Sequence, residues 1–236
     1  MKGKLLRIIP FGIALICLGS AFLTVGCGSS NARYRFVQAA TGLNNNVDVQ
    51  VDGKTVLTSV GFGNPGTYHS VKSGSRHFQI FPTGTTTNAY VDASVSVEND
   101  TTLIMVTPPP PTGIALSVFT DDNTAPTTGN AKIRVINTST TASANGVDVY
   151  VVPHNSGIGG FNPQITSLTF NNPSNYLSLA AGDYDVAVTQ PGTQNIINSL
   201  TFTFTGLASG QIRTLVIIES SFGGGPYTFV QLNDLN

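Results

Sequence analysis

The sequence contains an internal repeat, and this repeat limits the folds that the chain can adopt. Three pairs of segments correspond: 32–37 with 131–136, 47–51 with 147–151, and 60–80 with 168–188. Self-similarity of this kind predicts two similar structural units in tandem. The spacing between the copies grows beyond residue 151, so the second unit is expected to carry an insertion around PHNSGIGGFNP (153–163).

Both copies have the residue pattern of short β-strands. In VDVQV (47–51) the valines alternate with polar residues, which is typical of a strand with one buried face. In ARYRFV (32–37), Tyr34 and Phe36 are expected on one face and the arginines on the other. We predict an all-β fold of two tandem immunoglobulin-like or transthyretin-like β-sandwich domains, with seven or eight strands each. Gly74 and Gly182 are expected to turn hairpins.

The repeat also sets the predicted boundaries. The 210 residues from Cys27 onward (236 minus 26) suit two domains of about 100 residues each. We predict β-sandwich domain 1 at 32–122, a linker at 123–130 and β-sandwich domain 2 at 131–236. The proline run 108–111 corresponds to a Ser/Phe/Gly-rich segment of the second copy, so it is expected to be a loop between strands. Its alternative is a polyproline ligand for a partner domain.

The N-terminus has the features of an export signal. Lys2, Lys4 and Arg7 precede an apolar run over 8–25 that ends in small residues, a pattern typical of a secretory signal peptide. The run is also long enough to be a marginal membrane span. An uncleaved anchor and an ordinary secreted protein are therefore the alternatives to the next interpretation.

The end of this run resembles the lipobox of bacterial lipoproteins. Gly26 and Cys27 are followed by Gly-Ser-Ser, although Thr24 stands where leucine is usual. The resemblance implies a signal peptide at 1–26, cleavage between Gly26 and Cys27, and attachment of acyl chains such as palmitate to Cys27. Residues 27–31 would then be the lipidated cysteine and a short tether. That places the protein in the cell envelope, on a membrane, at the periplasmic or surface face of the outer membrane in a Gram-negative cell.

The tether length and composition add further expectations. Four extended residues reach roughly 15 Å, so the first domain is expected near the bilayer with the second projecting outward. Cys17 lies in the signal, which leaves no pair of thiols for a disulfide. Without Lys2, Lys4 and Arg7 the chain has 8 basic and 12 acidic residues, a net charge of −4. Nucleic-acid binding is not expected from such a chain.

The repeated motifs resemble a known family. They are Val47-Asp48-Val49, Asp52-Gly53, Tyr68 and Gly74, and in the second copy Val147-Asp148-Val149, Tyr176 and Gly182. Together they are similar to the bacterial domain of unknown function 4397 family in two tandem copies. The second copy is the more diverged, because Val152-Pro153 stands in place of Asp52-Gly53. The resemblance implies exported, often lipid-anchored envelope proteins, and no catalytic residues.

Polar candidates are few. Asp48 and Asp148 are either cation ligands or, as we prefer, polar positions beside the outward arginines Arg35 and Arg134, where an exposed pair contributes only ~0–1 kcal/mol. Asp121-Asp122-Asn123 (121–123) is a local oxygen group that could take calcium. His69 and His77 could approach each other around Gly74 as a weak zinc or copper site, but neither they nor His154 come with a third ligand in the sequence.

The remaining residues favour a binding or structural role. Five tyrosines could stack on sugars, although Tyr68 and Tyr176 fit the hydrophobic pattern and are expected in the core with hydrogen-bonded hydroxyls. The tyrosines considered are Tyr34, Tyr68, Tyr90, Tyr150 and Tyr176. We predict no metal, no cofactor and no catalytic centre. The predicted function is that of a non-catalytic, lipid-anchored cell-envelope protein that serves as a structural or protein-interaction module. A surface polysaccharide or small-ligand binding lipoprotein is the alternative, and a hydrolase is a third.

Overall fold

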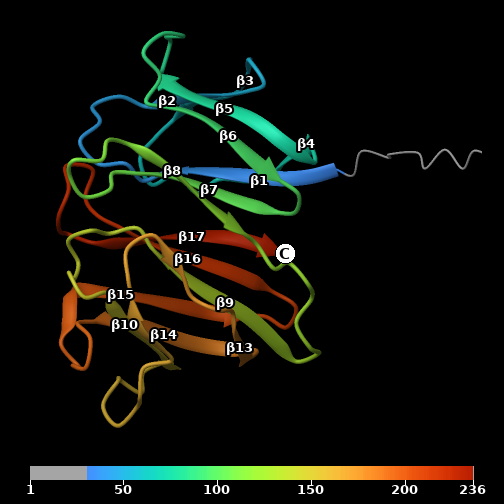
Figure 1. Cartoon of the computed structure of the whole chain (residues 1–236). Helices are drawn as coiled ribbons and strands as arrows, with labels where there is room; N and C mark the ends of the chain where they lie inside the picture. Colours follow the sequence, from blue (N-terminus) through green and yellow to red (C-terminus); the bar gives the residue numbers. More distant parts are fainter. Residues whose placement is uncertain (1–30, 236) are drawn as a thin grey trace, which may run out of the picture.

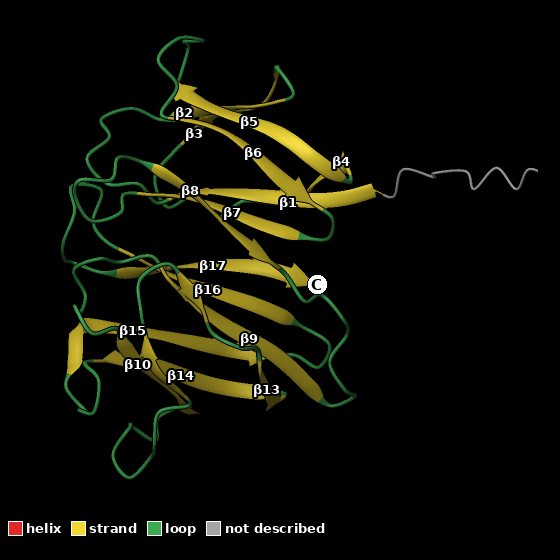
Figure 2. Cartoon of the chain, in the orientation of Figure 1, coloured by secondary structure: helices red, strands yellow, loops and turns green. Residues whose placement is uncertain are grey.

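The computed structural model describes residues 31–235, and its regular structure is entirely β (Figures 1 and 2). The all-β prediction is confirmed, and none of these residues forms a helix that could cross a bilayer. The predicted signal peptide, its cleavage site and Cys27 lie outside the described residues.

The first sandwich contains eight strands in two sheets. They are β1 (Asn31–Gln38), β2 (Val47–Val51), β3 (Lys54–Val60), β4 (His69–Lys72), β5 (Gly74–Pro82), β6 (Val91–Val97), β7 (Thr101–Val106) and β8 (Ala115–Thr120). The strand orders are β4-β1-β7-β8 and β3-β2-β5-β6, with β1 parallel to β7. Immunoglobulin sheets have the order ABED and CFG. The strand order of this sandwich therefore differs from the immunoglobulin order.

The second sandwich repeats this arrangement. Its strands are β9 (Asn130–Asn137), β10 (Val147–Pro153), β11 (Ile165–Leu168), β12 (Asn172–Pro173), β13 (Leu177–Ala180), β14 (Gly182–Thr189), β15 (Ile196–Leu207), β16 (Ile212–Ile218) and β17 (Thr228–Leu235). The sheets are β12-β9-β16-β17, with β13 also on β9, and β11-β10-β14-β15. β9 is parallel to β16, as β1 is to β7. The proline run 108–111 connects β7 to β8, as predicted.

The predicted glycine hairpins are wrong. β4 pairs with β1 in one sheet and β5 pairs with β2 in the other, so the chain crosses between sheets at Gly74. Only Ser73 separates the two strands, which is too short for a two-residue hairpin loop. Gly74 has φ +112°, a backbone conformation that glycine adopts readily, and this allows the sharp corner. β13 and β14 cross between sheets in the same way at Ala181.

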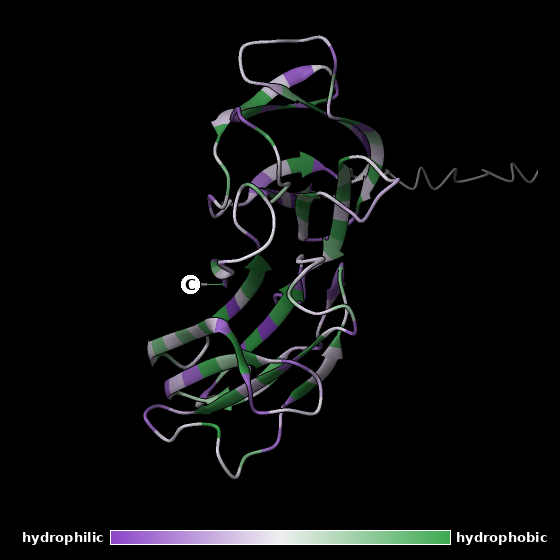
Figure 3. Ribbon diagram, turned by 90° about the vertical axis from the view of Figure 1, so that its left-hand side faces the viewer, coloured by the Kyte–Doolittle hydropathy of each residue, from purple (hydrophilic) through white to green (hydrophobic). Residues whose placement is uncertain are grey.

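Each sandwich has its own apolar core from alternating residues. Val47 and Val49 of β2, and Val147 and Val149 of β10, are fully buried, as the alternation predicts. Figure 3 shows the resulting banding of hydrophobic and hydrophilic residues along the strands, with paler or hydrophilic loops.

A third apolar layer joins the two sandwiches. It lies between the sheet that contains β1 and the sheet that contains β9, so the molecule is a stack of four sheets (Figure 1). Its buried members are Val37, Ala39, Ile104, Val106 and Phe119 from the first sandwich, and Ile136, Val216, Ile218, Val230 and Leu232 from the second. We call this set the apolar interface.

The two sandwiches therefore lie side by side. The start of β1 and the end of β17 lie on the same side of the stack, in its two middle sheets (Figure 1). The expectation that the second domain projects outward from the membrane depends on the tether, which lies outside the described residues. Residues 121–129 connect β8 to β9, close to the linker predicted at 123–130.

Candidate functional site

A buried charged cluster lies beside the apolar interface. It consists of Arg35 on β1, Asp121 after β8, Arg134 on β9 and Asp234 on β17, and each has less than a tenth of its surface exposed. Each arginine reaches across to the other sandwich. Arg35 Nη2 lies 2.7 Å from Asp234 Oδ1, and Arg134 Nη2 contacts Asp121 Oδ1. Two cations and two anions thus balance one another inside the protein.

Threonine and tyrosine hydroxyls complete the cluster in the same way on both sides. Arg35 Nε donates to Thr102 Oγ1 at 2.7 Å, and this hydroxyl donates to Asp121 at 2.7 Å. Tyr68 also donates to Asp121, and its ring lies 4.7 Å from the Arg35 guanidinium.

In the second sandwich the corresponding bonds run through Thr214. Arg134 Nε donates to Thr214 at 2.9 Å, and Thr214 donates to Asp234 at 2.6 Å. Tyr176 donates to Asp234 at 3.0 Å and lies under Arg134 at 4.9 Å. The hydroxyls of Tyr68 and Tyr176 are hydrogen-bonded as predicted, but both side chains are half-buried and lie at the charged cluster, outside the apolar cores where they were expected. These tyrosines are framework residues rather than a platform for sugars.

Burial shifts the pKa values of the cluster. Burial of Tyr68 and Tyr176 raises the pKa of each phenol well above its usual value, although the neighbouring arginine opposes the rise. Burial also disfavours the charged form of Arg35, but attraction by Asp234 and Asp121 outweighs it and raises the pKa. The phenols therefore stay neutral donors and the guanidinium stays charged.

The prediction of exposed arginines beside Asp48 and Asp148 is wrong. Arg35 and Arg134 do alternate away from their own sandwich core, but that outer face is covered by the other sandwich. Extending the repeat to SVFTD (117–121) and VQLND (230–234) would have revealed the matching carboxylates.

Asp48 and Asp148 instead pin two loops each. Asp48 accepts the Ser59 amide at 2.8 Å and the Gly84 amide at 2.9 Å. Asp148 accepts the amides of Ser167 and Gly192 at 2.7 and 2.8 Å. Both serines have positive φ, which is unfavourable for a residue with a side chain.

These amide bonds, led by the one from Gly84, lower the pKa of Asp48. Both aspartates thus have a structural role, but their partners are loop amides in place of the expected arginines, and Asp148 is buried instead of exposed.

The oxygen groups at 121–123, considered as a possible calcium site, do not converge. Asp121 is committed to the charged cluster, and Asp122 pairs with Lys132 Nζ at 2.9 Å. A hydrogen bond from the Thr124 hydroxyl is the main cause that lowers the pKa of Asp122, to about 2, and the hydrogen bond from Lys132 is the next largest. Asn123 Nδ2 donates to Asp100 at 2.7 Å. Among residues 31–235 no group of three or more His, Cys, Asp or Glu side chains is placed to hold a metal ion.

The three histidines lie apart. His69 is on β4 with its ring 5.8 Å from Tyr34, whereas His77 is in the opposite sheet and contacts Asp92 at 2.6 Å. The zinc or copper pair proposed for His69 and His77 is therefore not formed. His154 Nδ1 lies 2.8 Å from Asp185 Oδ1 in the second sandwich.

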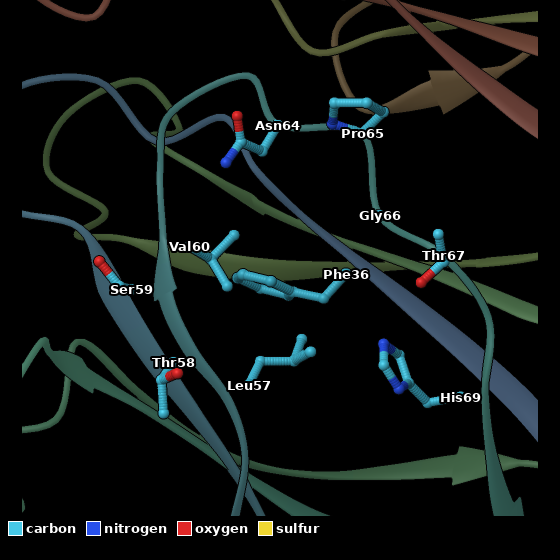
Figure 4. Close-up of a pocket in the computed structure, with 10 residues that line it drawn as sticks. All are labelled: Phe36, Leu57, Thr58, Ser59, Val60, Asn64, Pro65, Gly66, Thr67 and His69. Atoms are coloured by element: carbon cyan, nitrogen blue, oxygen red, sulfur yellow. The ribbon is translucent and has the colours of Figure 1, made fainter.

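One pocket opens at the side of the first sandwich (Figure 4). It has a volume of about 220 Å³ and lies between β3 and the segment that leads into β4. Phe36, Leu57 and Val60 lie together at its centre, with His69 to one side (Figure 4). Its volume is below the 300–1,000 Å³ that is usual for small-molecule sites.

A second pocket lies on the outer sheet of the second sandwich. It has a volume of about 310 Å³ and is lined by residues that include Val152, Ala187, Ile196 and the His154–Asp185 pair. Ile158 of the predicted insertion packs over Tyr150, Val152 and Ala187, which makes this outer face apolar.

Tyr90 of the first sandwich packs against that sandwich's core, as Tyr34 does.

Fold and site together define a double β-sandwich fused through a shared buried ion cluster. The model of the family named domain of unknown function (DUF4397) matches residues 32–150, which is 119 of 236 residues. The chain belongs to this family, as the motifs indicated. The match runs beyond the predicted boundary at 122 and ends at Tyr150 in β10.

Other comparisons found only distant similarity. Comparison with curated proteins gave no significant match. The Bacillus anthracis TIE protein is 11% identical with a TM-score of 0.27, over 80% of this chain and 34% of that one. A structure of alpha-glucan binding by a streptococcal virulence factor is 12% identical with a TM-score of 0.27, over 78% and 92%.

A leucine-rich repeat protein from Bacteroides thetaiotaomicron is 12% identical with a TM-score of 0.21, over 83% and 27%. The chain thus spans about a third of the TIE protein and less of the leucine-rich repeat protein. Similarity this low does not bear on function.

Proposed function

We propose that the chain is a non-catalytic, lipid-anchored protein of the bacterial cell envelope that binds another envelope protein. The anchor rests on the lipobox-like sequence around Cys27. The test is growth with labelled palmitate. Wild type and Cys17→Ala should incorporate label, because Cys17 belongs to the signal, and Cys27→Ala should not. Equal labelling of the Cys27 variant would refute the anchor.

The second sandwich is, in this proposal, a diverged second copy of the family domain. The observation that carries the proposed role is the buried charged cluster together with the apolar interface, which joins both copies through one continuous buried contact. Such a contact holds the loops of the two sandwiches in a fixed relation for presentation to a partner. The acidic balance of the chain does not favour nucleic acid.

The loop after β16 is the proposed contact site. Phe222 is 87% exposed there, the largest exposure among the large hydrophobic residues of the described chain. The backbone of this loop is tied to the first sandwich, because the Gly42 amide donates to the Ser221 carbonyl at 2.8 Å. An exposed aromatic on a fixed loop is a frequent anchor in protein interfaces.

In-cell cross-linking tests this contact. A photo-reactive residue at Phe222 should yield one dominant envelope protein, whereas the same residue at exposed Ala208, at the other end of β16, should not. Identical products from both positions, or none from Phe222, would refute the assigned contact site.

A second candidate is binding of a surface polysaccharide or small ligand. The outer pocket with Val152, Ile196 and His154 favours it, because apolar walls with a few polar groups are typical of ligand sites. Glycan-array binding that is lost in Ile196→Asp and kept in Val56→Asp, an equally exposed valine of the first sandwich, would support this candidate. Retained binding in both variants would exclude this pocket.

A further inference from the structure

The interface between the sandwiches is reciprocal. The first sandwich gives Arg35 to Asp234, and the second gives Arg134 to Asp121. The two arginines occupy matching places on β1 and β9, and the two aspartates follow or lie in the matching strands β8 and β17. Mutual exchange of the same two groups is the property of a two-fold, isologous interface between identical subunits.

The apolar interface has the same reciprocity. β1, the adjoining Ala39, β7 and β8 supply five buried residues, and the corresponding β9, β16 and β17 supply five more. The hydroxyl partners are also paired, since Thr102 and Tyr68 on one side match Thr214 and Tyr176 on the other. Each sandwich therefore presents both halves of the contact on a single face.

We propose that each sandwich can pair with a second copy of itself through this face. In a contact between two first sandwiches, Arg35 of each copy meets Asp121 of the other, and the charges cancel as they do in the single chain. The apolar residues of β1, β7 and β8 then pack against their own counterparts. Linkage of the two sandwiches in one chain favours the internal pairing because it keeps them close together.

Charge exchange within one sandwich tests the proposal on the full chain. In Arg35→Asp/Asp121→Arg, two altered first sandwiches remain complementary to each other. The internal contact becomes repulsive, because residue 35 then faces Asp234 and residue 121 faces Arg134. We expect the wild type to be a monomer and this variant to form dimers or longer chains in native mass spectrometry. In these assemblies the first sandwich of one chain would bind the first sandwich of another, and the second sandwich would bind the second.

Exchange at all four positions is the matched control. Adding Arg134→Asp and Asp234→Arg makes the internal contact complementary again, so this variant should return to a monomer. A folded double variant that stays monomeric would overturn the proposal. Equal association of the double and fourfold variants would overturn it too, because association would then not follow complementarity.

A second measurement covers failure of the double variant to fold. In this measurement a protease site replaces residues 124–128, and both sandwiches keep their wild-type sequence. The folded protein is cleaved at this site, and the two separate sandwiches are diluted and re-equilibrated. Species with two first sandwiches and species with two second sandwiches are expected beside the original pair. Detection of the original pair alone, or of monomers alone, would overturn the proposal.

Discussion

Replacement of Asp234 by asparagine removes one charge of the buried cluster and little else. The side chain keeps its size and can still accept from Thr214 and Tyr176. Arg35 has no exposed surface, and its one remaining carboxylate is Asp121 at 3.5 Å, which already pairs with Arg134. A pair of charges about 4 Å apart is worth about 4 kcal/mol at an effective dielectric constant of about 20.

Breaking a buried ion pair by removing one partner costs about 3–5 kcal/mol in other proteins, in agreement with that value. We therefore expect Asp234→Asn to lower the free energy of unfolding by about 3–5 kcal/mol. Urea denaturation followed by far-UV circular dichroism and tyrosine fluorescence measures this, since the chain has seven tyrosines and no tryptophan.

Two controls make the measurement specific. Asp92→Asn breaks the exposed pair with His77 and should cost less than about 1 kcal/mol. The double variant Arg35→Met/Asp234→Asn removes the cation that Asp234→Asn leaves unpaired. Its loss in free energy of unfolding should therefore be about 2 kcal/mol smaller than the sum of the losses in the two single variants. If Asp234→Asn costs no more than Asp92→Asn, the cluster does not hold the sandwiches together.

Three further substitutions follow from the structure. Asp148→Asn weakens the bonds from two loop amides and should cost about 1–3 kcal/mol in urea denaturation; no change would exclude the loop-pinning role. Burial opposes ionisation of Glu219, but hydrogen bonds led by the Gly224 amide outweigh it and lower its pKa from 4.5. The contribution of the Glu219 carboxylate to stability is therefore complete above about pH 4.5 and is lost as the pH falls through the lower folded pKa. Glu219→Gln should flatten the acid side of the stability–pH curve, and an unchanged slope would contradict this. Gly66→Ala would place Cβ 2.2 Å from the Phe36 carbonyl oxygen and should cost at least about 1–3 kcal/mol, whereas Gly113→Ala meets nothing within 4 Å and should cost much less; equal thermal midpoints would refute the clash.

The sequence was sufficient for the strands and their inner faces. Alternation placed Val47 and Val147 in two cores, and the repeat located the proline loop correctly. The first inference depends on local periodicity and the second on the internal repeat, and a single sequence contains both.

Alternation could not identify what covers the outer face of a strand. Arg35 has the sequence pattern of a solvent-exposed residue, yet a carboxylate about 200 positions away in the chain makes its burial favourable. The corner at Gly74 was missed for a related reason, because turn residues indicate a change of direction and not the sheet that the next strand joins.

The reciprocal ion cluster also has a consequence for how such chains can diverge. Loss of either sandwich would leave a bare arginine and a bare carboxylate on the survivor unless it paired with a second copy of itself, so neither half is expected to persist as an isolated sandwich. The family match extends through β9, far enough to include Arg134, the partner of Asp121. The sheets at the two outer faces take no part in the contact between the sandwiches, and the insertion at 153–163 lies on one of them. Such sandwiches are therefore expected to be inherited together as pairs, with insertions confined to the outside of the stack.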